Sequence, residues 1–404
     1  MNILLLTIVD MPGIYEHGIY PDLLRFFRNS GHSIYTVSPY EKRTGLKTDI
    51  KEETGVSMLH VEIGNITKCS MIEKGISTLR IEQQFLSAIK EFFGQVKFDL
   101  VLYSTPPITF ASVIKYIKRR DGARSYLLLK DIFPQNAVDI GIMTKKGPKG
   151  LLYRYFRRKE KKLYAISDRI GCMSQANVDY LLENNPEISP KKVGICPNSI
   201  EIRDMSITDE ERFTIREKYG IPHDKKIFVY GGNLGRPQGI PFIIECLKAQ
   251  KSNPDAYFLI VGDGTEYGKL DAFFNEENPS NMKLMNRLPK DDYDRMIAAC
   301  DVGLIFLDHR FTIPNFPSRL LSYMQAGLPV LACTDTCTDI GEAIVNGGFG
   351  WWCESSDIAA FGKAVEAASA SNDSQMRDRE IAYLKENYTV ERAYKTIINS
   401  FEGK

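Results

Sequence analysis

The pattern that most constrains this chain is a repeated alternation of short apolar runs with longer stretches of helical periodicity. In the first half the apolar runs are continuous, as expected for parallel strands that are covered on both faces. The pattern predicts βαβ units and a parallel sheet. The predicted strands are Ile3–Ile8, Ser33–Val37, Leu100–Tyr103, Ser125–Leu129 and Arg169–Met173.

A second series of the same kind follows the polar segment Cys196–Met205, which reads as a linker. The fold class is therefore predicted to be α/β, with two tandem doubly wound domains. We expect the first domain at 1–198, the second at 199–385, and a C-terminal helix within 386–404 that packs back toward the first. In such sheets ligands bind beyond the carboxyl ends of the strands, so a site in a cleft between the domains is expected.

Composition excludes several classes of protein. The 404 residues are 43% apolar and 25% charged, which is typical of a globular chain, and a formal charge of +1 argues against a general nucleic-acid binder. The eight cysteines lack metal-binding spacing and are expected to be free thiols. The apolar start breaks at Pro12-Gly13 and lacks a basic region, so we expect a buried strand and no signal peptide. No apolar run is long enough to predict a membrane span.

Two segments of the second half predict a phosphate-binding site. They are "VYGGNLGRPQG", from Val229 to Gly239, and "PNFPSRLLSYMQAGLPVLA", from Pro314 to Ala332. Each has a Gly- or Pro-rich loop that opens into a helix, whose first N–H groups and positive dipole end suit an anion. Two such helix starts in one domain favour a diphosphate, and therefore a nucleotide-linked substrate. Either segment alone is equally typical of an ordinary βα turn.

Further polar residues are expected at the same sheet edges. "LIVGDG" ends a predicted strand in a turn that contains Gly262, Asp263 and Gly264, and Asn286–Pro289 follows the next strand. In the first domain, Asp131 ends a predicted strand, and the loop Asp10–Gly18 contains His17. The sequence contains no serine elbow, no P-loop lysine and no dinucleotide fingerprint.

At these residues the chain resembles the retaining glycosyltransferases of family 4, which have the GT-B fold. Within that family it is most similar to the WbuB-like enzymes of bacterial capsule and O-antigen clusters. The resemblance covers nearly the whole chain. Its most specific parts are "GHSIYTVSP", "KDIFPQNAVDIG", "YGGNLGRPQG", "VGDG" and "PSRLLSYMQAGLPV".

The resemblance implies two Rossmann-like domains, of which the second binds a nucleotide-sugar and the first an acceptor. The implied activity is transfer of a hexose or N-acetylhexosamine to a lipid-linked or growing glycan. The donor is expected to be UDP-linked, because UDP is the usual donor nucleotide in this family. The expected donor-binding residues are Gly232, Asn233, Gln238, Gly239, Gly262, Asp263, Gly264, Arg287, Leu288, Asn315, Ser318 and Arg319. The expected acceptor-binding residues are Gly13, His17, Gly18 and Asp131.

The chain also departs from the family pattern. Many members place Arg and Lys in the first phosphate loop, where this chain has Asn233 and Gln238 and keeps Arg236 as the only cation. Many carry two glutamates eight residues apart, where this chain has Pro314 and Ser322. These departures leave the contacts to the sugar ring open.

The expected chemistry follows from charge. Breaking the anomeric C–O bond leaves a nucleoside diphosphate with growing negative charge, which Arg236, Arg319 and the helix starts would stabilise without a metal ion. Retention places the acceptor on the face of the leaving phosphate, and Asp131 would orient the acceptor hydroxyl or act as base. We expect no cofactor.

Two other functions stay open at this point. UDP-sugar 2-epimerases use the same two-domain fold but need carboxylates and histidines in the cleft, and few are available here. A degenerate protein that binds a sugar nucleotide without turnover is the other alternative, because the glutamate pair is missing.

The segment Lys145–Lys162 predicts a membrane-docking surface. It contains nine Lys or Arg and one Glu, interleaved with Leu151, Leu152, Tyr153, Tyr155 and Phe156. On a helix, five apolar residues would fall near one side: Leu151, Leu152, Tyr155, Phe156 and Leu163. Basic and aromatic side chains suit the headgroup layer of an anionic membrane. A core helix with a solvated basic face would show the same periodicity. With a lipid-linked acceptor, we expect a cytoplasmic protein that is peripheral on the inner face of the cytoplasmic membrane.

Overall fold

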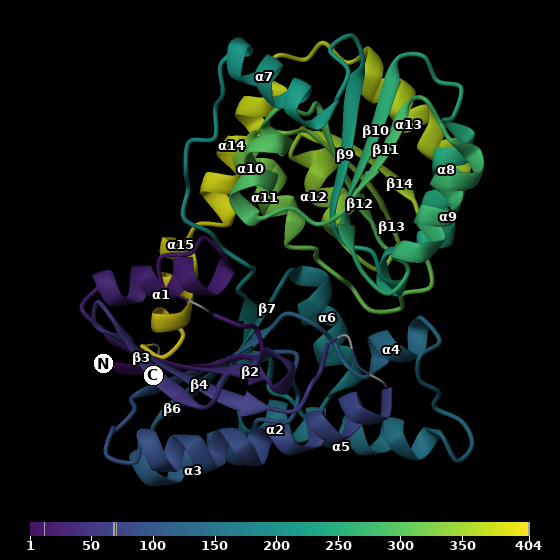
Figure 1. Ribbon diagram of the computed structural model, residues 1–404. Helices are drawn as coiled ribbons and strands as arrows, with labels where there is room; N and C mark the ends of the chain where they lie inside the picture. The colour runs from purple at the N-terminus through teal and green to yellow at the C-terminus, as the bar shows by residue number, and fades with distance from the viewer. Residues whose placement is uncertain (12, 68, 70, 403–404) are drawn as a thin grey trace. The chain divides into compact units, whose positions relative to one another are not determined.

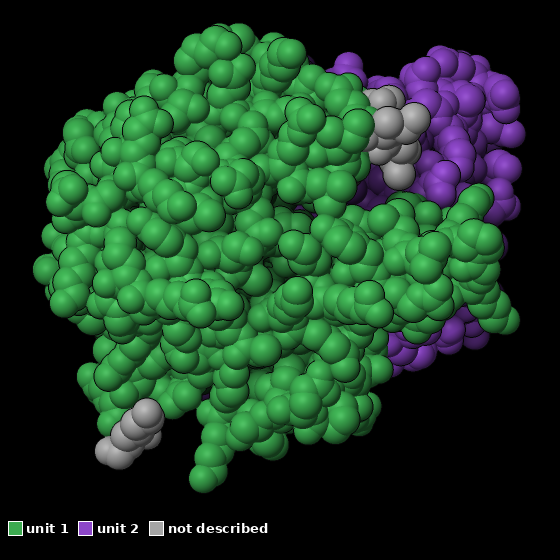
Figure 2. All heavy atoms as spheres, turned by 90° about the horizontal axis from the view of Figure 1, so that it is seen from below, with its two compact units in different colours: residues 1–201, 390–404 green, residues 202–389 purple. Residues whose placement is uncertain are grey.

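The computed structural model describes residues 1–11, 13–67, 69 and 71–402, so Pro12 of the first loop lies outside the described residues (Figure 1). The chain divides into two compact units (Figure 2). Unit 1 is Met1–Glu201 together with Val390–Lys404, and unit 2 is Ile202–Thr389. The borders expected from the sequence were 198/199 and 385/386.

Unit 1 contains a sheet in the order β3-β4-β2-β1-β5-β6-β7-β8. Every neighbouring pair in it is parallel except β3 and β4, which form an antiparallel hairpin. Its strands are β1 Asn2–Leu6, β2 Ser33–Glu41, β3 Asp49–Glu53, β4 Val56–Ile63, β5 Leu100–Ser104, β6 Arg124–Leu129, β7 Arg169–Cys172 and β8 Val193–Ile195. Its helices are α1 Ile19–Asn29, α2 Met71–Phe92, α3 Ala111–Asp121, α4 Gln135–Asp139, α5 Gly150–Ile166, α6 Gln175–Asn184 and α15 Val390–Asn399.

Helices cover both faces of this sheet, as a parallel sheet requires (Figure 1). One apolar core joins the strands to α2, α3, α5 and α6, and a second joins the opposite face to α1 and α15. The C-terminal helix α15 packs on α1 through Tyr394, whose ring centroid lies 5.2 Å from that of Phe26 and 4.9 Å from that of Phe27.

Unit 2 contains a sheet in the order β11-β10-β9-β12-β13-β14, in which all neighbouring pairs are parallel. The two sheets confirm the predicted fold class. The strands are β9 Lys226–Asn233, β10 Ala256–Asp263, β11 Met282–Met285, β12 Val302–Phe306, β13 Val330–Thr334 and β14 Gly350–Glu354. The helices are α7 Asp209–Tyr219, α8 Ile240–Ala249, α9 Tyr267–Glu277, α10 Lys290–Ala298, α11 Arg319–Ala326, α12 Ile340–Asn346, α13 Ile358–Ala370 and α14 Met376–Asn387.

One buried acid marks the packing of α14 on α11. Glu380 is fully buried, and neither carboxylate oxygen has a hydrogen-bond partner among the described residues. Burial raises the pKa of Glu380 well above its ordinary value of 4.5, although the nearby charge of Arg377 opposes the shift. The folded chain therefore holds this carboxyl in its neutral form to a higher pH than the unfolded chain does.

We predict that Glu380→Met stabilises the protein, and that the gain grows as pH rises from 5 to 8. Above pH 4.5 the unfolded chain ionises Glu380 while the folded chain resists ionisation, so the wild type loses stability with rising pH and the variant does not. Thermal unfolding should show a midpoint higher by about 2–4 °C for each kcal/mol gained. A gain independent of pH would contradict this explanation.

Candidate functional site

The sheet of unit 2 has one topological switch point, between β9 and β12. The chain runs outward from β9 through β10 to β11, and then returns to β12 on the other side of β9. The loops that follow β9 and β12 consequently leave the sheet in opposite directions, and a crevice at such an edge is where doubly wound sheets bind ligands. Both segments predicted to bind phosphate belong to these loops.

The loop after β9 is held by its own side chains. Gln238 Oε1 accepts hydrogen bonds from Asn233 Nδ2 at 2.9 Å and from the Gly235 N–H at 3.2 Å. Gly239 then adopts a left-handed conformation, with φ 65°, directly before α8. A Cβ there would be in ordinary contact with the backbone of Asp308, 3.4 Å from its Cα. Gly239 is thus needed for the left-handed turn, and the loop after β12 packs beside it.

Arg319, the first residue of α11, lies against the end of β9. A Cβ on Gly232 would be 3.3 Å from Arg319 Nη2, and the guanidinium carbon is 4.2 Å from the centroid of the Tyr230 ring. Arg319 Nη1 is buried and has no hydrogen-bond partner in the described part of the chain. The two predicted segments are therefore in contact, and a guanidinium donor remains available at their junction.

Three tyrosines surround this guanidinium without neutralising it. Burial raises the pKa of Tyr230 and of Tyr293, and it raises the pKa of Tyr323 to about 12. Tyr323 is also fixed in place, because its hydroxyl donates toward the Val229 and Leu304 carbonyls at 3.1 Å. The phenols stay neutral at physiological pH, so Arg319 contributes a full positive charge to this edge.

These tyrosines are not among the residues that the sequence predicted for the site. Tyr323 follows Arg319 by four residues, a spacing that places both side chains on one side of a helix. This spacing could have predicted that Tyr323 lies beside Arg319. Tyr293 approaches from α10, and a Cβ on Gly231 would clash with its hydroxyl at 1.9 Å. Nothing in the local sequence predicts that contact.

Arg236 differs from Arg319 in its surroundings. Its side chain is 53% exposed, and its Nε lies 3.6 Å from Glu266 Oε1. Glu266 also pairs with Lys269. Of the two cations expected beside a diphosphate, Arg319 is enclosed and has no carboxylate partner among the described residues, whereas Arg236 is solvated and paired.

The glycines after β10 serve packing between loops. A Cβ on Gly262 would lie 1.9 Å from the Gly232 carbonyl oxygen, and one on Gly264 would lie 2.4 Å from that of Leu234. The backbone that approaches them closely is the β9 loop of the protein itself. Asp263, between them, is half-buried and stands opposite Asn233 in the register of the two strands.

The remaining expected donor-binding residues lie at the same edge. Asn315 and Ser318 belong to the loop between β12 and α11, and Asn315 Nδ2 is buried without a partner among the described residues. Thr338 Oγ1 donates to the Asn315 carbonyl at 2.5 Å and so links this loop to the one after β13. Arg287, exposed, and Leu288, half-buried, follow the outermost strand β11.

Asp131 lies at the carboxyl end of β6 in unit 1. Thr105 Oγ1 accepts from the N–H groups of Lys130 and Asp131, at 3.1 and 3.2 Å, and Asp131 Oδ1 accepts from Asn136 Nδ2 at 2.7 Å. Burial raises the pKa of Asp131 above its ordinary value, against the effect of these bonds. A carboxylate with a raised pKa and a fixed orientation suits either proposed role, as base or as orienting group.

Lys130 is a further polar group at this edge, and it was not predicted from the sequence as a site residue. Its Nζ donates to the Cys196 carbonyl at 3.3 Å, and burial lowers its pKa to about 8. It has no carboxylate partner in the described part of unit 1. A partly uncompensated amine beside Asp131 makes the local charge sensitive to pH.

The first loop of unit 1 is organised around Arg25. This arginine bonds Asp22 and also Glu201, with Nη2 2.7 Å from Glu201 Oε2. His17 Nδ1 lies 3.9 Å from Asp22 Oδ1, and the Gly18 N–H donates to the same oxygen at 3.0 Å. His17, Asp22 and Glu201 are near enough to share a metal ion, but the cation between the two carboxylates is the Arg25 guanidinium. Gly13, in the same loop, faces Glu53 of β3.

Known proteins similar to this chain are glycosyltransferases. Residues 211–386, nearly all of unit 2, match the family described as Glycosyl transferases group 1. The chain is thus similar, over residues 211–386, to the group 1 glycosyltransferases. It is 26% identical over 325 residues to the glycosyltransferase WbjE of Pseudomonas aeruginosa, covering 80% of this chain and 78% of that one. It is 23% identical over 361 residues to the colanic acid biosynthesis glycosyl transferase WcaI of Escherichia coli K12, covering 85% of each chain.

The fold is also that of solved glycosyltransferase structures. Anabaena HepE, crystallised with UDP and glucose, superposes with a TM-score of 0.70 at 14% identity over all of both chains. The chain therefore has the GT-B fold, and over 85% of its length it is similar to a glycosyl transferase of colanic acid biosynthesis.

We predict that Arg319→Ala lowers the rate of sugar transfer by about 10²–10³, because one fixed cation facing developing charge is worth that much. Arg236→Ala serves as the matched control and should cost about tenfold or less, since an exposed, paired arginine contributes little. The measurement is kcat/KM for the donor, with circular dichroism to verify folding. If folded Arg319→Ala keeps more than about half of the wild-type activity, the phosphate-binding role of this residue is wrong.

Proposed function

We propose that this protein is a glycosyltransferase that moves a sugar from a UDP-linked donor to a lipid-linked or growing glycan in bacterial capsule or O-antigen biosynthesis, with retention of configuration. The observation that carries the proposal is Arg319, an enclosed guanidinium with a buried donor free at the carboxyl ends of β9 and β12. A diphosphate placed there would meet this cation and the N–H groups at the starts of α8 and α11.

The proposed reaction breaks the bond between the anomeric carbon and the donor phosphate and forms one to the acceptor oxygen on the same face. The acceptor hydroxyl proton passes to a phosphate oxygen of the leaving nucleotide. Arg319 stabilises the charge that develops on the diphosphate, because it is already in place and poorly solvated. Asp131 would orient the acceptor hydroxyl or assist in removing its proton.

The assignment of substrates rests on the relatives. WbjE, WcaI and a teichuronic acid biosynthesis glycosyltransferase of Bacillus subtilis, TuaC, support a bacterial surface polysaccharide as the product. The HepE structure with UDP supports a UDP-linked donor. The absence of the glutamate pair, with Pro314 and Ser322 in its place, favours the WbuB-like subgroup within this proposal.

Incubating the protein with a panel of UDP-, GDP- and dTDP-sugars without acceptor tests the function. A transferase should release nucleotide slowly from one donor, and UDP should give the largest thermal stabilisation in a parallel screen. A changed sugar would indicate a 2-epimerase instead, and binding without turnover, even when extracted lipid-linked glycan is added, would indicate a non-catalytic protein.

We further propose that transfer needs no metal ion or other cofactor, because Arg319 and the helix starts supply the positive charge that the leaving diphosphate requires. EDTA should therefore leave most of the activity intact, measured as nucleotide released from the preferred donor in the presence of acceptor. Complete loss of activity on chelation, restored by Mn²⁺ or Mg²⁺, would overturn this part of the proposal. Arg319→Ala assayed with added Mg²⁺ is the control for partial replacement of one cation by another.

We also propose that unit 1 docks on the anionic inner face of the cytoplasmic membrane through Lys145–Lys162. None of the helices in the described part of the chain has the length and apolarity that crossing a bilayer requires. Helix α5 divides into two sides. Leu163 is fully buried and Phe156 packs on Phe133, so these belong to the core, while Leu151, Leu152 and Tyr155 are exposed.

The exposed side of α5 combines these apolar side chains with unpaired bases. Arg154, Arg158 and Lys162 are exposed and have no ion pair among the described residues. Arg157, by contrast, bonds Glu160 Oε2 at 2.5 Å and the Asn184 carbonyl at 2.9 Å, so it stabilises the fold. Apolar residues flanked by free cations are what a headgroup layer binds.

We predict that the variant Arg154→Glu/Arg158→Glu/Lys162→Glu loses binding to anionic vesicles by about a hundredfold or more, since each near-surface base contributes roughly 1 kcal/mol. Co-sedimentation with phosphatidylglycerol vesicles measures it, and high salt should weaken wild-type binding. The matched control reverses three exposed bases of unit 2, Arg295, Lys363 and Lys385. Equal binding by the α5 variant and the wild type would contradict the proposed docking through Lys145–Lys162.

A further inference from the structure

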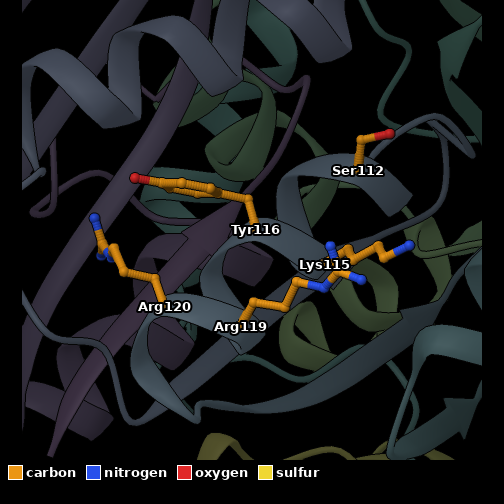
Figure 3. A pocket seen from close by; sticks show the side chains of 5 residues that line it. All are labelled: Ser112, Lys115, Tyr116, Arg119 and Arg120. Carbon is orange, nitrogen blue, oxygen red and sulfur yellow. The ribbon is translucent and has the colours of Figure 1, made fainter.

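A surface pocket lies along the exposed side of α3, the helix beside α5. Its volume is about 410 Å³, and Figure 3 shows the five side chains that line it. They are Ser112, Lys115, Tyr116, Arg119 and Arg120. Because these positions recur at spacings of three and four residues, they form one stripe of the helix. The opposite side of α3, with Val113, Ile114 and Ile117, is buried against the sheet.

The bases of this pocket differ in how they are used. Arg120 is committed to the fold, because it bonds Asp121 at 2.6 and 2.7 Å and the Val96 carbonyl at 2.6 Å. Lys115 and Arg119 are exposed and have no ion pair among the described residues, and in Figure 3 their side chains extend together on the side away from Tyr116. The pocket therefore offers two free cations beside a fixed one.

The ring of Tyr116 is held between two cationic groups, one of which is Arg120 of the pocket itself. Lys90 Nζ lies 5.0 Å from its centroid and the Arg120 guanidinium 5.4 Å. These contacts fix the phenol at the rim of the pocket. The helix α3 contains four Lys or Arg and one Asp, in a chain whose formal net charge is only +1. Lys118 is paired with Asp168 and Arg120 with Asp121, so Lys115 and Arg119 are the bases of α3 that have no ion pair among the described residues.

The pocket and the exposed side of α5 belong to one helical layer. Glu82 of α2 accepts from the Ser112 N–H at 2.6 Å and from Lys159 of α5 at 3.2 Å, and so links α2, α3 and α5. All three helices cover the same face of the sheet (Figure 1). Since the core-facing residues of α3 and α5 point to that sheet, their free bases point away from it, on the same outer side.

We propose that this pocket binds the phosphate of an anionic phospholipid headgroup, as a second membrane contact beside α5. The inference rests on the proposed membrane docking of α5. The Arg119 guanidinium matches two phosphate oxygens, Lys115 adds a second charge, and the Ser112 hydroxyl is a further donor. The aliphatic stems of the two bases offer apolar surface to the glycerol part of a lipid. Two contacts on one rigid layer would fix the orientation of unit 1 on the bilayer.

The test is co-sedimentation of the full chain with phosphatidylcholine vesicles, with and without phosphatidylglycerol. The variant Lys115→Gln/Arg119→Gln removes the two free cations, and Lys363→Gln/Lys385→Gln removes two exposed bases of unit 2 as the matched control. We expect binding about 25-fold weaker for the pocket variant, roughly fivefold for each base. The control variant should bind like the wild type, and none should bind neutral vesicles.

Two further measurements separate the sources of phosphate and the two contacts. If millimolar inorganic phosphate protects α3 from hydrogen exchange as well as the vesicles do, the pocket is a free-phosphate site and the lipid assignment is wrong. If the α5 variant loses vesicle binding while the pocket variant keeps it, this inference is wrong and the docking of α5 stands. If neither variant loses binding, the proposed docking of α5 fails as well.

Discussion

The contact between Arg319 and Gly232 is the constraint on which the arrangement of unit 2 depends. It joins the start of α11 to the end of β9 across the switch point of the sheet, and a Cβ on Gly232 would lie 3.3 Å from Arg319 Nη2, closer than an ordinary contact. The guanidinium is enclosed by phenols that burial keeps neutral, so its charge is not cancelled inside the protein. An enclosed cation of this kind is costly without an anion, and this is the reason that we propose a diphosphate as its ligand.

The same principle separates Arg319 from the other bases of the chain. Arg25 lies between Asp22 and Glu201, and Arg120 is fully bonded to Asp121 and backbone carbonyls. These arginines hold loops in place and have little charge left for a ligand. Burial together with the absence of a carboxylate partner, and not the presence of arginine alone, distinguishes a binding group from a structural one.

Unit 1 shows how one amphipathic helix can have two uses. Leu163 and Phe156 of α5 complete the core, while Leu151, Leu152 and Tyr155 remain exposed among free bases. Helical periodicity grouped all five together, because a 3.6-residue repeat does not say which side of a helix meets the sheet. The free bases of α3, Lys115 and Arg119, point outward in the same layer, so unpaired positive charge of α3 and α5 lies on one face of unit 1.

The sequence by itself determined the fold class, because continuous apolar runs separated by helical stretches have few solutions other than parallel sheets covered on both faces. It also indicated the two loops of unit 2, since glycines and helix starts are local features. It missed three strands of unit 1. The edge strand β3, "DIKEE", is polar and needs no apolar alternation to pair, and β8 has only three residues. The strand β4, Val56–Ile63, was missed although its apolar run is a local signal. Tertiary structure alone decided three features of the protein. They are the tyrosines around Arg319, the pairing of Arg236 with Glu266, and which side of α5 packs on the sheet. Each depends on which elements meet in space, and residues far apart in the chain leave no local signal of that meeting.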